Sequence, residues 1–335
     1  MPESESEVRK AKHQRTEEPQ ITRSEVWHDD GSVVLQAENT QFRVHWSVLS
    51  LHSSFFREMR ALPQPPDQPS VEGCPVIRLH DSSADVQYLL DALYNPLVFR
   101  DSSPPSLPFI SGIIRIGRKY DFKSLFTAAV EHLTYENPTT LEEYERLRGG
   151  WGDGDSDSAA MYRPAKLSGF AGITSLFDIV TLARENQLLT VLPCAYLRAI
   201  LLAANDPALI LDGAPRSDGS SVKLSQEDLR TCILGSRKLM DAQWKQNDLW
   251  KWFSSDELAD GCTDKLVCLS TKKAVFQVVL RKSICLVPYH PLFGFLCSAC
   301  NHRHLEVMAD GRKQLWAELP ICFGLPPWEE LKNEL

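Results

Sequence analysis

Four cysteines in the last quarter of the sequence have the residue type and the spacing of a metal site. Five residues separate Cys262 from Cys268, and two separate Cys297 from Cys300. Thiolates paired in this way can share one zinc ion, which prefers four ligands in a tetrahedron. The five-residue gap exceeds the usual two to four, and free cysteines are often buried as small apolar residues. The pattern predicts a structural zinc site at these four cysteines, with buried thiols as the alternative.

Other arrangements that might carry chemistry are incomplete. A nucleophilic pair of Cys297 or Cys300 with His302 or His304 would need a lowered thiol pKa and a cleft, and adjacency in sequence supplies neither. The glycine-rich run 149–154 lacks the Gly-Lys-Ser/Thr of a phosphate loop. The acidic run 153–157 lacks the glycine and the bidentate glutamate of a calcium loop. We therefore expect no catalytic residue, no bound cofactor other than zinc, and a protein that is not an enzyme.

Composition narrows the class of protein further. The chain has 335 residues and a net charge of −8, and no segment has the basic excess of a nucleic-acid-binding protein. The first twenty residues lack the apolar run of a signal peptide, and the most apolar stretch, 188–204, is interrupted by Pro193 and Arg198. The sequence therefore predicts an intracellular protein without a membrane span and without direct nucleic-acid contacts. Residues 9–15 have the basic pattern of a nuclear import signal, or are a solvated tail, so nucleus and cytoplasm both stay open.

The elements that must position these residues differ between the two parts of the chain. Residues 33–37 and 40–44 are strands joined by turn residues, and 76–79 is a further strand. Helical spacing follows in 46–59, 86–93, 110–117 and 125–133. Beyond residue 160 the pattern is helical, with a capping box at 225–228 and expected helices at 272–281 and 292–319. The last of these helices would place Cys297, Cys300 and His304 on one face.

This pattern divides the chain into three regions. Residues 1–24 are expected to form a disordered arm, and 25–136 an α+β domain with a short sheet. Residues 137–335 are expected to be a mostly α-helical region, with flexible loops near 149–165 and 212–222.

Part of the α+β domain, 25–136, resembles the BTB/POZ family. Residues 45–59 match its H-x-x-x-L-x-x-x-S-x-x-F-x-x-M core, the run 29–37 resembles the first strand, and 109–133 resembles the closing helical pair. The motif and interface positions implied by the resemblance are Trp27, Val33, Phe42, Arg43, His45, Trp46, Leu49, Phe55, Phe56 and Met59. The segments 182–186, 232–235, 296–300 and 319–331 are similar to fungal BTB-domain proteins that carry a C-terminal helical region.

The resemblance implies protein–protein interaction without catalysis. It implies a homodimer with Trp27, Val33 and residues 46–49 at the interface, and an adaptor that recruits a partner such as a cullin-type ubiquitin ligase or a corepressor. The alternative is a nuclear transcriptional regulator or co-regulator with a structural zinc site. Two positions depart from the pattern of dimeric BTB transcription factors. Ser32 stands where an aspartate would face Arg43, and Trp46 replaces a basic residue, so we expect an incomplete charged pocket.

Overall fold

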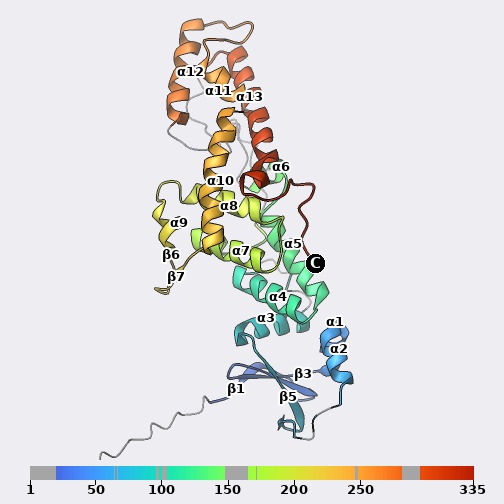
Figure 1. Ribbon diagram of the computed structural model, residues 1–335. Helices are drawn as coiled ribbons and strands as arrows, with labels where there is room; N and C mark the ends of the chain where they lie inside the picture. Colours follow the sequence, from blue (N-terminus) through green and yellow to red (C-terminus); the bar gives the residue numbers. More distant parts are fainter. Residues whose placement is uncertain are drawn as a thin grey trace, which may run out of the picture.

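The computed structural model describes residues 20–63, 65, 67–95, 98–99, 104–147, 165–170, 172–245, 248–280 and 295–335. Figure 1 shows an elongated molecule, with a small β-sheet at one end and a group of helices at the opposite end. Further helices stack along the length between them. The fold is thus an α+β region followed by a helical region, as the sequence predicts.

Five short strands form the sheet: β1 (Thr22–Trp27), β2 (Val33–Ala37), β3 (Thr40–Val44), β4 (Ser70–Val71) and β5 (Cys74–Leu79). Their order is β1-β3-β2-β5-β4. Strands β2 and β3 form the predicted antiparallel hairpin, and Glu38 in its turn has a φ of +50°. Strand β1 corrects the expectation of disorder up to residue 24, because Thr22 and Arg23 pair with the edge of β3. Their polar side chains made this edge strand look like part of a tail.

Five helices follow the predicted pattern around the sheet: α1 (Trp46–His52), α2 (Ser54–Ala61), α3 (Ser83–Tyr94), α4 (Leu107–Lys119) and α5 (Lys123–Glu136). Ser53 separates α1 from α2. Its hydroxyl accepts a hydrogen bond from the Phe56 backbone N–H and donates one to the Tyr120 carbonyl. This buried serine therefore caps α2 and ties it to the end of α4.

The remainder of the chain is helical: α6 (Leu141–Leu147), α7 (Ile173–Glu185), α8 (Leu192–Leu202), α9 (Ala208–Asp212), α10 (Gln226–Lys245), α11 (Asp248–Ser254), α12 (Lys265–Leu280), α13 (Ser298–Ala317) and α14 (Leu319–Cys322). The predicted capping box opens α10, where the Ser225 hydroxyl accepts from the Asp228 N–H. The loop expected at 212–222 contains a short ladder of β6 (Ala214–Pro215) and β7 (Ser221–Val222).

Two helix starts differ from the expected positions. Helix α12 begins at Lys265 rather than at residue 272, because the Asp264 carboxylate accepts a hydrogen bond from the Val267 N–H and caps the helix. Helix α13 begins at Ser298, so Cys297 is its N-cap and lies outside the helix. Residues 292–294, the arm at 1–19 and the expected loop at 149–164 lie outside the described residues.

One hydrophobic core joins the two regions. Ile113 of α4 and Leu133 of α5 are fully buried in the same cluster as Phe177, Leu197 and Trp316 of the helical region. A second, smaller cluster lies between the sheet and helices α1–α4. The helical region therefore packs directly onto α4 and α5, and a domain boundary at residue 137 stays a prediction.

The C-terminal segment strengthens this junction. The Arg118 guanidinium, at the end of α4, donates to the carbonyls of Asn186 and Glu334 and to the Glu334 carboxylate at 2.8–2.9 Å. The Asn333 side chain accepts from the N–H and hydroxyl of Thr190. Figure 1 shows the C-terminus beside α4 and α5. Within the described residues, no helix has the length and apolar character to cross a membrane.

Candidate interaction surface and metal centre

Helices α1 and α2 present an apolar surface that the helical region does not cover. Leu51 is 71% exposed, Leu62 is 63% exposed and Phe55 is 38% exposed. In Figure 1 these two helices lie to one side of the sheet, away from the helices that follow α5. Strand β1 is an edge of the same sheet, and no strand among the described residues pairs with its outer side. Exposed large apolar side chains beside an open strand edge are features of an association surface.

The motif histidine has a structural role at the start of α1. The Tyr94 hydroxyl lies 2.9 Å from His45 Nδ1 and accepts a hydrogen bond from the His45 backbone N–H. Nε2 of His45 lies 3.0 Å from an Asp30 carboxylate oxygen, and this hydrogen bond lowers the pKa of Asp30. These contacts fix the turn between β3 and α1.

Several residues expected at an interface are core residues. Val33, Phe42, Leu49 and Phe56 are at most 1% exposed, and Trp46 is 8% exposed. Within one chain they pack between the sheet and α1–α4, so Val33, Trp46 and Leu49 have almost no surface to offer a second copy. This corrects the expected interface, which would instead use their exposed neighbours on α1 and α2.

Met59 is half-buried at the margin of this core, whereas Trp27 is half-buried against a separate cluster of Val34, Cys74 and Val76. The Arg23 guanidinium stacks 4.4 Å from the centroid of the Trp27 ring. Trp27 thus keeps some surface on the edge strand β1.

Arg43 has a carboxylate partner from outside the expected aspartate position. Ser32 does stand in the expected place, and its hydroxyl accepts from the Trp46 N–H. The acid comes instead from Glu72, whose carboxylate lies 2.9 Å from Arg43 and 2.5 Å from Arg23. Glu72 follows β4 in a tight turn and has a φ of +52°. The turn dipeptide Glu72-Gly73 is the sequence signal that could have identified this partner, because the turn places the Glu72 side chain over the neighbouring strands.

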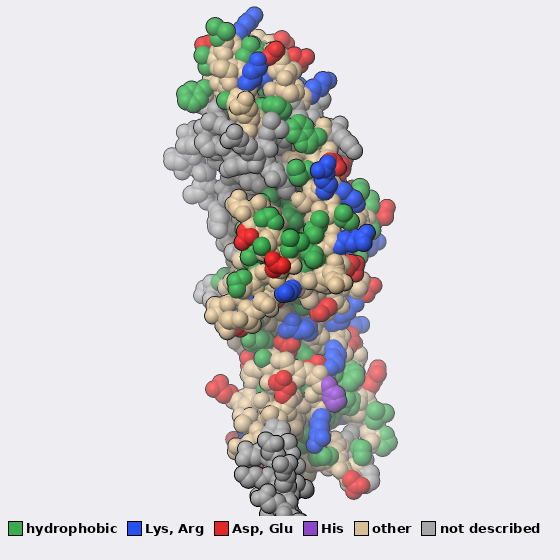
Figure 2. All heavy atoms as spheres, turned by 60° about the vertical axis from the view of Figure 1, so that its left-hand side comes forward, with side chains coloured by type: hydrophobic (Ala, Val, Ile, Leu, Met, Phe, Trp, Pro, Cys, Tyr) green, Lys and Arg blue, Asp and Glu red, His purple; other side chains and the backbone are tan. Residues whose placement is uncertain are grey.

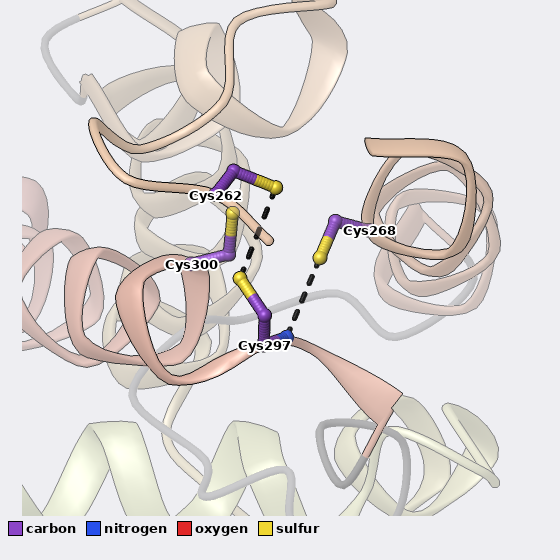
Figure 3. Close-up of side chains that lie close together, drawn as sticks. All are labelled: Cys262, Cys268, Cys297 and Cys300. Carbon is purple, nitrogen blue, oxygen red and sulfur yellow. Dashed lines mark hydrogen bonds between the residues drawn. The ribbon is translucent and has the colours of Figure 1, made fainter. Parts of the chain in front are cut away.

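The four cysteines predicted to bind zinc meet at one point. Their Sγ atoms all lie within 4.8 Å of one another, and those of Cys262 and Cys297 are 3.8 Å apart. A zinc ion with Zn–S bonds of about 2.3 Å has sulfur atoms ~3.8 Å apart in a regular tetrahedron. Figure 3 shows the four side chains converging from the loop before α12, the first turn of α12 and the start of α13. The arrangement can hold one tetrahedral metal ion.

The surroundings of the cysteines favour thiolates at this point. Hydrogen bonds from the backbone N–H groups of Cys300 and Thr263 lower the pKa of Cys297 to about 6. The Cys268 sulfur accepts from the Cys297 N–H. The N-termini of α12 and α13 both face the cluster and carry partial positive charge. Burial acts the other way and raises the pKa values of Cys268 and Cys300, a cost that a bound cation would offset.

Lys272, near the cluster, has a supporting role, whereas His304 does not. Lys272 is 1% exposed, donates to the carbonyls of Ser255 and Glu257, and lies 4.3 Å from the Trp252 ring. Its positive charge counters the negative charge that four thiolates would bring. His304, expected on the same face as the cysteines, is not part of the cluster and packs 5.3 Å from Phe253.

The comparison with known proteins matches only the α+β part of the chain. The family model of the BTB/POZ domain matches residues 28–137. This range contains the sheet from β2 onward, helices α1–α5 and the motif around His45. No curated protein matches the chain.

Proposed function

Because residues 28–137 are a BTB/POZ domain, a protein-interaction module, we propose that this chain is a non-enzymatic adaptor that associates with a second copy of itself. In this proposal the BTB domain forms the dimer and recruits one partner, and the helical region holds a client. The observation that carries it is the placement of the helical region on α4 and α5, which leaves α1, α2 and β1 open.

The dimer contact is proposed to centre on Leu51, Phe55 and Leu62. Burying large apolar side chains in a contact between copies is favourable by about 1.5–3 kcal/mol for each fully buried side chain. The open side of β1 offers backbone groups for pairing across the contact.

Size-exclusion chromatography with light scattering tests this contact. The double variant Leu51→Glu with Leu62→Glu is expected to be monomeric, whereas the wild type is dimeric at micromolar concentration. A matched control is Leu266→Glu, since Leu266 is 83% exposed on α12 at the far end of the molecule. A wild-type monomer, or a dimer that survives the double variant, would contradict the proposal.

The recruited partner is proposed to be a cullin-type ubiquitin ligase. A pull-down of a cullin by the full chain, lost in a BTB surface variant, would support this role. A second candidate is a nuclear regulator or co-regulator that recruits a corepressor, and the cysteine cluster favours it because structural zinc sites are common in such proteins. Nuclear localisation that is lost when Arg9, Lys10 and Lys12 are replaced would favour the second candidate.

We also propose that Cys262, Cys268, Cys297 and Cys300 hold one structural zinc ion. All four positions of the tetrahedron are protein ligands, so the site leaves no coordination position open for chemistry. The ion would tie the loop before α12 to the start of α13, and its binding energy would become folding energy of this end of the molecule.

Metal analysis of the purified chain tests the zinc site. We expect one equivalent of zinc for each chain, and less than half an equivalent after Cys297→Ser. Cys322→Ala is the matched control, because Cys322 is buried on α14 outside the cluster. A wild-type chain without stoichiometric zinc, whose melting does not respond to a chelator, would refute the site.

A further inference from the structure

A cleft lies between α10 and the segment that follows α14. One wall is a single face of α10, at helical spacing: Glu227, Arg230, Thr231, Leu234 and Lys238. The opposite wall is residues 322–325, and Arg184 of α7 closes one end. The cleft is separate from both the α1–α2 surface and the cysteine cluster.

The walls are held rigidly. Gly235 allows the close approach of the Phe323 ring, because a Cβ atom at Gly235 would lie 2.2 Å from it. Phe323 in turn packs 5.2 Å from the buried ring of Tyr196. After α14 the chain reverses at Gly324, whose φ is +73°, and the Leu325 N–H returns to the Pro320 carbonyl. The cleft is therefore formed in the free protein.

The cleft carries positive charge that the described structure leaves uncompensated. Arg184 is already matched, since it lies 3.1 Å from the buried Asp228 and 3.5 Å from Glu227. Arg230 and Lys238 have no carboxylate partner among the described residues. This local excess occurs on a chain whose net charge is −8. A ligand that complements the cleft must bring negative charge, and Asp or Glu carboxylates of a protein segment supply it.

The same cleft has an apolar centre. Leu234 lies between the two cations on α10 and is 47% exposed, and Ile321, beside the opposite wall, is 52% exposed. Leu325 adds a half-buried aliphatic side chain. Figure 2 shows apolar side chains gathered at mid-height on the helical region, with Lys and Arg side chains along one side of them. An apolar side chain from a partner could be buried here between charged contacts.

The volume of the cleft lies at the lower end of the range for small-molecule sites. Its volume is about 280 Å³. Sites for small molecules and cofactors occupy roughly 300–1,000 Å³ and enclose most of their ligand. A shallow cleft of this volume suits one or two anchoring side chains of an extended segment, with the rest of the segment on the surface.

The cleft also unites segments that are far apart in the sequence. Arg184 comes from α7, Leu234 from α10, and the opposite wall from residues 322–325.

We propose that this cleft is the client-binding site of the adaptor and takes a short acidic peptide segment. One apolar side chain of the segment packs on Leu234 and Leu325, and flanking Asp or Glu carboxylates pair with Arg230 and Lys238. The inference rests on the proposed adaptor function, because it identifies the surface that holds the client.

Selection from a displayed library of random eight-residue peptides on the immobilised full chain tests the proposal. The enriched peptides are expected to place Asp or Glu beside Leu, Ile, Met or Phe. A fluorescein-labelled enriched peptide should bind the wild type, and its affinity should fall at least about tenfold in Leu234→Glu and in Lys238→Glu, measured by anisotropy. Both positions are exposed, and a melting curve of each variant confirms that it folds.

Arg237→Glu is the matched control. It makes the same charge change one residue away on α10, but Arg237 is 74% exposed, pairs with Asp241 and does not line the cleft. Its affinity for the peptide should stay within about twofold of the wild type. No enrichment, enrichment of basic peptides, or equal binding by Leu234→Glu would overturn the proposal. The proposal would also be overturned if an eight-nucleotide RNA displaced the peptide and Leu234→Glu left peptide binding unchanged.

The same assay separates failure of the cleft from failure of the dimer. The variant with Leu51→Glu and Leu62→Glu keeps the whole cleft, so it should bind the peptide as the wild type does even when it is monomeric. Loss of peptide binding in that variant would overturn the proposal that the cleft binds peptide independently of the dimer.

Discussion

The shared core predicts that the BTB domain of this chain does not fold by itself. A fragment of residues 20–137 retains the sheet and α1–α5 but loses every helix that covers the outer face of α4 and α5. Six large apolar side chains of these two helices are 0–4% exposed in the core shared with the helical region: Ile110, Ile113, Ile114, Phe126, Val130 and Leu133.

The magnitude follows from the burial of these side chains. Leaving a large aliphatic or aromatic side chain exposed costs at least about 1.5 kcal/mol relative to full burial, so full exposure of six would cost ~9 kcal/mol. Exposure of even half of that apolar surface would lower the free energy of unfolding by ~4–5 kcal/mol. The whole free energy of unfolding of a typical domain is about 5–15 kcal/mol. The fragment should therefore lose most of its stability.

Thermal melting by circular dichroism and chromatography of the fragment are the assays. We expect a broad, non-cooperative melt, dye binding to exposed apolar surface, and aggregation. Co-expression of residues 165–335 as a separate chain is the control, and it should restore a soluble complex with a cooperative melt. A fragment that is monodisperse and melts cooperatively above about 45 °C, as stable mesophilic domains do, would refute the shared core as a requirement.

Three further predictions concern single residues of the helical region. Gly235→Ala should lower the free energy of unfolding by about 1–3 kcal/mol, because its methyl group overlaps Phe323. Gly172→Ala is the control and should not destabilise the chain, because Gly172 has no close neighbour. An equal loss of stability in both variants would contradict this prediction. Burial lowers the pKa of His304 to about 4 from its ordinary 6.5, so the unfolded chain binds its proton first, and stability should fall by up to about 3 kcal/mol as the pH drops from about 6.5 to 4. Replacement by Gln should flatten this part of the stability profile in denaturant titrations, and an unchanged slope would count against it. A chelator should lower the melting temperature of the wild type but not of Cys297→Ser, which lacks the intact zinc site, and equal shifts in both proteins would argue against a structural metal.

Local patterns predicted most of the elements. The hairpin of β2 and β3, the helices around the His45 motif and the capping box at Ser225 follow from apolar spacing and turn residues that act over a few positions. The cysteine cluster was also predicted as a set, because residue type and spacing alone suggest a shared ligand.

Features that depend on distant contacts were not predicted. Glu72 pairs with Arg43 from a turn whose geometry places it over two other strands. Strand β1 exists because β3 has a free edge, although Thr22 and Arg23 are polar. The burial of Val33 and Leu49 depends on how α1 packs on the sheet, and a motif does not reveal which side of a helix faces the core. Such facts arise only when the chain is folded.

The cleft beside α10 was invisible in the sequence for the same reason. Its lining comes from residues as far apart as Arg184 and Leu325. Cys232 and Leu239 of α10 are fully buried, whereas Leu234 of the same helix is 47% exposed. A face that is left uncovered by tertiary packing can be identified only from the packing itself.

Native mass spectrometry of the intact chain over a micromolar concentration series tests the central claim most directly. A self-associating BTB protein should appear at twice the 37.8 kDa chain mass, and the Leu51→Glu, Leu62→Glu variant at the single-chain mass under the same conditions. A wild type that stays at the mass of one chain throughout the series would contradict the account.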